Sequence, residues 1–70
     1  MARKLNGPAL GVAQSLAKAL EQDNGPLITL RFKKLRGMLG KNLDGHANEL
    51  RELLDDNMAA RLTRITSFEF

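Results

Sequence analysis

The amino-acid sequence predicts a small α+β domain with a three-helix core, one short strand and a C-terminal strand. Two stretches, 8–22 and 44–56, place apolar residues three and four positions apart, which is the spacing of one helix face. Elsewhere apolar and polar residues alternate, which is typical of half-buried strands. The 70 residues include no cysteine, so one modest core without disulfide support is expected.

The first helix is expected from Pro8 to Gln22. Proline is favoured at the first helical position, because the amide that it lacks would be unpaired there anyway. One stripe of this helix is apolar and consists of Ala9, Val12, Ala13, Leu16 and Leu20. The breaker residues at 23–26 then end the helix.

The middle of the chain combines two patterns. Alternation of apolar and polar residues predicts a short strand over 27–30. The apolar residues that follow are spaced by three and four, so a short second helix is expected over 31–39. Gly40 can end it, because glycine adopts the left-handed conformation without strain.

The third helix is expected over 44–56. Asp55 and Asp56 are unfavourable at the C-terminal end of a helix because of its dipole, and Asn57 can adopt the left-handed conformation, so the helix is expected to stop there. After it, alternation over 60–70 predicts a terminal strand. The alternative, in which 58–66 continue as helix, stays open. The residues that would extend the helical stripe are Met58, Leu62 and Ile65.

So short a chain must be stabilised by few apolar side chains. The expected core residues are Val12, Leu16, Leu20, Ile28, Leu30, Leu35, Leu39, Leu50, Leu54 and Leu62. Association is a common reinforcement for so small a core, so we expect a homodimer with Phe68 and Phe70 in its interface. Alternatively, these two rings close the core of a single chain.

Residues 1–7 are interpreted as a flexible basic N-terminus, and 8–70 as one domain. No apolar run approaches the roughly 20 residues needed to span a bilayer, and no secretory signal is recognised. We therefore expect a cytoplasmic protein, nucleoid-associated if it binds DNA, with no membrane partner.

Charge is divided unevenly along the chain. Residues 1–41 carry eight cations and two anions, whereas 42–70 carry three cations and six anions. A dense cationic segment favours a polyanionic partner, although a solvated basic face is the alternative. The candidate nucleic-acid contacts are Arg31, Lys33, Lys34, Arg36 and Lys41, with Arg61 and Arg64 as secondary contacts.

Nothing in the sequence indicates catalysis or a cofactor. His46 is the only histidine, and without cysteine a zinc site would need carboxylates to complete it, so an exposed or capping role is expected. Asp55 and Asp56 are adjacent and point about 100 degrees apart on a helix, so they cannot flank one substrate. We therefore expect a non-enzymatic protein without a metal.

The predicted element order resembles a reduced winged-helix domain. Residues 25–30, which lead into an amphipathic stretch that ends at 39–40, are similar to the opening of its second helix. The resemblance implies binding to DNA, where the later helix of a helix-turn-helix enters the major groove. Here that helix is acidic, so phosphate contacts are expected from the basic segment instead. The acidic residues in question are Glu49, Glu52, Asp55 and Asp56.

The same order is similar to the minimal core of a KH domain, whose GXXG loop clamps nucleic-acid backbone. Residues 37–40 match that pattern and Lys41 follows them. The resemblance implies RNA binding through this loop. The alternative interpretation of both glycines is a helix cap and a tight turn.

The leading hypothesis is a small, non-enzymatic DNA-binding module that regulates transcription or a mobile element, with DNA favoured over RNA. The first alternative is a protein-interaction module, such as an inhibitor or adaptor, which uses the acidic third helix and the edge formed by Phe68 and Phe70. The second alternative is the KH-like RNA-binding module.

Overall fold

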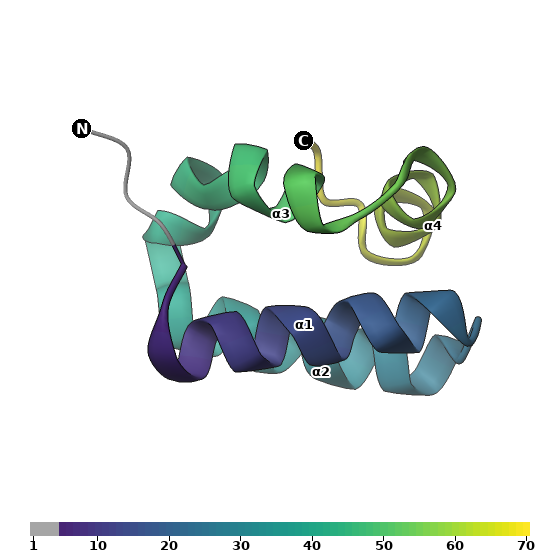
Figure 1. Ribbon diagram of the computed structural model, residues 1–70, viewed down its shortest axis with the longest axis horizontal. Coiled ribbons are helices and arrows are strands. Elements are labelled where there is room, and N and C mark those ends of the chain that lie inside the picture. The colour runs from purple at the N-terminus through teal and green to yellow at the C-terminus, as the bar shows by residue number, and fades with distance from the viewer. Residues whose placement is uncertain (1–4) are drawn as a thin grey trace.

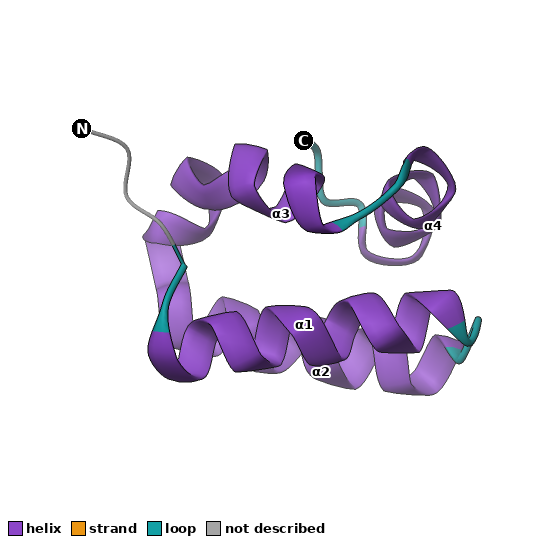
Figure 2. Cartoon of the chain, in the orientation of Figure 1, coloured by secondary structure: helices purple, strands orange, loops and turns teal. Residues whose placement is uncertain are grey.

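The computed structural model describes residues 5–70, and there every regular element is a helix (Figure 2). The elements are α1 (Gly7–Glu21), α2 (Gly25–Leu39), the 3₁₀ helix η1 (Gly40–His46), α3 (Ala47–Leu53) and α4 (Asp56–Thr66). The predicted α+β class is therefore wrong, because residues 5–70 form an all-α domain. Neither strand on which the winged-helix and KH resemblances depended is formed.

The helices pack in two layers (Figure 1). α1 and α2 form an antiparallel hairpin, which is the first layer. η1 leads the chain away from the hairpin, so that α3 and α4 lie over it as the second layer. α4 crosses the hairpin and packs on both of its helices, within a domain that measures 33 × 20 × 18 Å.

α1 confirms the predicted first helix to within one residue at each end. Pro8 lies in its first turn, and Asp23 follows its end with a φ of +56°. Residues 1–4 of the predicted flexible N-terminus lie outside the described part of the chain. Leu5 is buried and its amide donates to the carboxylate of Glu49, so this residue is tied to the domain.

α2 replaces both the predicted strand over 27–30 and the predicted short helix. The Asn24 side chain accepts a hydrogen bond from the Leu27 amide at 3.2 Å, which caps a helix that begins before the expected strand. Its buried stripe is Ile28, Phe32 and Leu35, at spacings of four and three. Leu30, which suggested alternation, is 59% exposed and is no part of the core.

The GXXG segment does not form a loop. Gly37 lies inside α2, and only Gly40 leaves the helical conformation, with a φ of +54° where α2 ends and η1 begins. The interpretation as a helix end and tight turn is therefore correct for Gly40, and the KH loop is not present.

The predicted third helix over 44–56 is wrong at both ends. η1 occupies its start, α3 ends at Leu53, and Leu54 is extended. Asp55 then accepts a hydrogen bond from the Met58 amide at 2.8 Å and caps α4, while Asp56 lies in its first turn. Both carboxylates thus begin a helix, where the dipole favours negative charge, and do not end one.

The predicted C-terminal strand is also wrong, because residues 56–66 form α4. The alternative interpretation, in which 58–66 are helical, is correct. These residues do not continue α3, however, because a break at Leu54 and Asp55 separates the two helices. Ala59 and Leu62 are the buried residues of α4, and Ser67 ends it with a φ of +64°. The last residues then fold back, which places Phe68 in the core.

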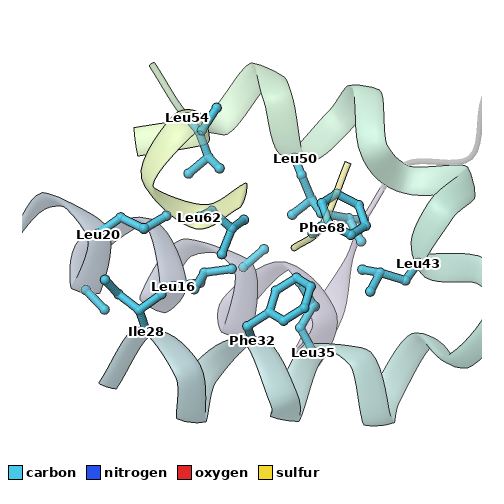
Figure 3. Packing of buried hydrophobic residues seen from close by; sticks show 14 residues of the cluster. Leu16, Leu20, Ile28, Phe32, Leu35, Leu43, Leu50, Leu54, Leu62 and Phe68 are labelled. Atoms are coloured by element: carbon cyan, nitrogen blue, oxygen red, sulfur yellow. The ribbon is translucent and has the colours of Figure 1, made fainter. Parts of the chain in front are cut away.

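The core lies between the two layers (Figure 3). Its fully buried large side chains come from every α-helix and are Leu16, Leu20, Ile28, Leu35, Leu50 and Leu62. Phe68 lies among them with its ring 5.5 Å from that of Phe32, edge to face. Of the expected core residues Leu54 is also buried, while Val12 and Leu39 are half-buried at its edge.

Candidate nucleic-acid interface

α2 is the most basic element that the structure describes. Its 15 residues hold four cations and no carboxylate. The hairpin from Gly7 to Leu39 carries five cations and two anions, whereas the second-layer segment from Ala47 to Thr66 carries three cations and four anions. The domain therefore presents a basic layer and a weakly acidic one.

Three lysines on α2 and at the start of η1 are exposed to solvent. Lys33 and Lys34 are exposed on α2, and Lys41 is exposed in the first turn of η1. Among residues 5–70, the close contacts between acidic and basic side chains are His46–Glu49, Arg51–Asp56 and Arg61–Asp23, so none of them involves these lysines. Their ammonium groups are available to an external anion, and we call the three lysines the basic ridge.

A groove lies between α1 and α2. It is lined by Ser15, Lys18, Ala19, Gln22, Leu27 and Arg31 and has a volume of ≈ 140 Å³. The structure thus brings Arg31, which is half-buried, to the same groove as Lys18. Sequence reasoning missed Lys18, because its place on the outer face of the first helix gave no sign of the neighbouring helix.

A second groove lies between α2 and α4. It is lined by Thr29, Phe32, Lys33, Arg36, Ile65 and Thr66 and has a volume of ≈ 230 Å³. The Arg36 guanidinium carbon is 5.0 Å from the centre of the Phe32 ring, a cation–π contact that holds the side chain over an aromatic floor. Both threonine hydroxyls donate to carbonyl groups of their own helices. Two grooves, each with two cations, therefore border α2.

The two predicted secondary contacts have different environments. Arg61 is half-buried, donates to the Leu20 carbonyl at 2.7 Å and lies 3.3 Å from an Asp23 carboxylate oxygen. It therefore joins α4 to the C-terminal end of α1, where a cation also complements the helix dipole. Arg64 is exposed on α4, in the second layer. We therefore assign Arg61 to folding and leave it out of the proposed surface.

Arg61→Gln is expected to destabilise the domain by about 1 to 3 kcal/mol, because the Leu20 carbonyl loses a charged donor. Urea unfolding followed by circular dichroism measures this change. Arg64→Gln removes the same charge from an exposed site and is expected to stay within about 0.5 kcal/mol of the original protein. Equal stability of the two variants would contradict the structural role of Arg61.

The acidic residues of the second layer are largely engaged within the domain. Glu49 accepts from the Leu5 amide and pairs with His46 Nδ1 at 3.0 Å. Arg51 bonds the Asp56 carboxylate and donates to the Leu54 carbonyl. The predicted exposed or capping role of His46 is wrong. The residue is buried, at 8% exposure, and its side chain makes no cap hydrogen bond.

The predicted interface residues Phe68 and Phe70 lie in different surroundings. Phe68 is buried in the core of its own chain, whereas Phe70 is 41% exposed and packs edge to face on Phe68 at 5.0 Å. The alternative interpretation, in which these rings close the core of a single chain, is therefore correct for Phe68. The homodimer stays a prediction, and Phe70 is the member of the pair that an external surface could contact.

Within residues 5–70, no group of three potential metal ligands lies close enough to hold an ion, and no helix is long and apolar enough to cross a bilayer. In comparisons with protein-family models, curated proteins and solved structures, the chain matched none of them.

Proposed function

We propose that this protein is a non-enzymatic nucleic-acid-binding module that contacts backbone phosphates through the basic ridge of Lys33, Lys34 and Lys41. The observation that carries the proposal is the charge of α2, which has four cations, no carboxylate and exposed lysines without an ion pair among the described residues. Duplex DNA carries one negative charge per roughly 1.7 Å of its axis, so such a surface attracts it strongly at low salt.

The packing of α2 favours contact with phosphates over base readout. A recognition helix must enter the major groove. α2 has α1 packed on one flank and α4 on the other, so only its outer ridge projects. At 1.5 Å per residue its 15 residues span about 22 Å, a length that can lie along the backbone of a duplex. We therefore expect little sequence specificity.

The position of the aromatic rings favours duplex DNA over single-stranded RNA. Proteins that bind single strands usually stack bases on exposed aromatic side chains. Phe32 and Phe68 are 3% and 6% exposed and are not accessible to a base, and Phe70 follows α4 in the second layer. The basic ridge therefore offers charge without a stacking platform.

Fluorescence anisotropy of a labelled random-sequence duplex tests this function. We expect micromolar affinity, and a slope of log K against log salt near −3 if three lysines each neutralise one phosphate, at roughly 0.9 per contact. A single-stranded RNA of equal length serves as the comparison. Preferential binding of the RNA would contradict the duplex assignment. Absence of binding to either at about 50 mM salt would overturn the proposal and favour the protein-interaction alternative.

A further inference from the structure

The groove between α1 and α2 differs in chemistry from the basic ridge. Two of the six lining residues are cations, Lys18 and Arg31, and two more carry neutral polar groups, Ser15 and Gln22. No carboxylate lines it. Among the described residues, none of these four side chains takes part in a hydrogen bond or an ion pair.

We propose that this groove is a subsite for a single phosphate group, held by Lys18 and Arg31 with Ser15 and Gln22 as neutral donors. The proposal deepens the proposed function, on which it rests for the identity of the natural ligand. This subsite differs from simple attraction to the basic ridge, because its donors line a groove from both helices of the hairpin. An oxyanion there is contacted from both sides.

The size and donor types of the groove fit a tetrahedral oxyanion. A volume of ≈ 140 Å³ exceeds what one water needs, so an ion of several oxygens can enter. Arg31 is half-buried, and its planar guanidinium can donate two parallel N–H bonds to a phosphate. Lys18 supplies a mobile point charge, and the hydroxyl and amide groups can satisfy the remaining oxygens. Ala19 and Leu27 form the apolar part of the lining.

The hairpin fixes the relative position of the two cations. Residues 22–24 make the tight connection between α1 and α2, in which the Asn24 amide donates to the Ala19 carbonyl at 3.1 Å. Lys18 lies one turn before the end of α1, and Arg31 lies two turns into α2, so both sit near this connection. The hairpin therefore sets the spacing between the two backbone positions, and only the side chains must be ordered when a ligand binds.

Amide NMR of the full chain during titration with inorganic phosphate, with total ionic strength held constant by chloride, tests the subsite. We expect saturable shifts at residues 15–22 and 27–31. Lys18→Gln is expected to weaken phosphate binding two- to fivefold, as the loss of one exposed ion pair does. Arg31→Lys keeps the charge and removes the planar fork, and should weaken binding as well. Arg64→Gln, which removes an equal charge from the second layer, should leave the phosphate affinity unchanged.

Two further titrations distinguish the sources of the phosphate group. A duplex without terminal phosphates presents diesters only, and a nucleoside 5′-monophosphate presents a monoester. If the duplex changes the amide chemical shifts of the groove residues, the ligand is a backbone phosphate. If only inorganic phosphate and the monophosphate change them, the ligand is a terminal or free phosphate. Linear shifts reproduced by chloride alone, or equal losses of phosphate affinity in Lys18→Gln and Arg64→Gln, would overturn the subsite. Duplex binding that persists without groove shifts would overturn the subsite and leave the proposed function standing.

Discussion

Phe68→Ala is expected to remove a large part of the stability of this domain. The ring is 6% exposed and packs edge to face on Phe32 and Phe70, so its removal leaves a cavity between the two layers. Truncation of a buried phenylalanine to alanine costs about 3 to 5 kcal/mol. A domain of this length is stable by roughly 4 to 10 kcal/mol in total. Urea unfolding followed by circular dichroism should show the midpoint falling by about a third or more.

Phe70→Ala provides the matched control. Phe70 is 41% exposed and its main contact is the edge-to-face pair with Phe68, so we expect a loss of only about 0.5 to 1.5 kcal/mol. Where Phe68→Ala does not fold, Phe68→Leu keeps most of the volume and gives a measurable intermediate value. If Phe70→Ala proves the more damaging of the two alanine variants, residues 67–70 do not close the core as described.

The sequence predicted α1 best, because residues at both of its ends indicate where a helix starts and stops. The proline of α1 and the breakers after it define that helix within one residue at each end. Most expected core residues are buried, because leucines at helical spacing face the interior whichever way the helices are arranged. Val12 and Leu39 are only half-buried, and Leu30 is exposed, since its burial was expected from a strand that does not form.

The strand predictions failed because the residues around Ile28 and Leu30 suit a helix N-terminus as well as a strand. A helix N-terminus and an edge strand both tolerate proline and branched apolar residues, so the alternation around Ile28 and Leu30 was ambiguous. The cap from Asn24 and the burial of both Ile28 and Phe32, which are four residues apart, belong to a helix. At the C-terminal end, Asp55 was interpreted as the end of one helix, although its capping geometry makes it the start of the next.

The candidate site could be predicted only in part. A run of cations without carboxylates identified α2, and the structure leaves its lysines exposed. Pairing between distant segments gave no local signal, so Lys18 was missed and the contacts of Arg61 within the domain were not foreseen. Lys18 meets Arg31 only because α1 and α2 pack as a hairpin, and Arg61 meets Leu20 only because α4 crosses it.

Replacement of both Lys33 and Lys34 by glutamine is expected to have the largest effect on DNA binding. Each lysine that neutralises one phosphate contributes about 0.9 to the slope of log K against log salt, so the pair should lower the slope by about 1.8. At about 50 mM salt, release of two fewer counterions weakens affinity on the order of a hundredfold. Anisotropy titrations over a series of salt concentrations measure both quantities.

The substitutions should leave the fold intact, which makes the binding result interpretable. Both lysines are exposed and unpaired among the described residues, so stability is expected to change by no more than about 0.5 kcal/mol. Lys34→Gln alone is compared with Arg64→Gln, which removes an equal charge from the second layer. A difference confined to Lys34 locates the phosphate contacts on α2, because net charge alone would weaken both variants alike. Equal slopes for the two single variants would show that attraction is spread over the whole molecule and would refute the ridge as the interface.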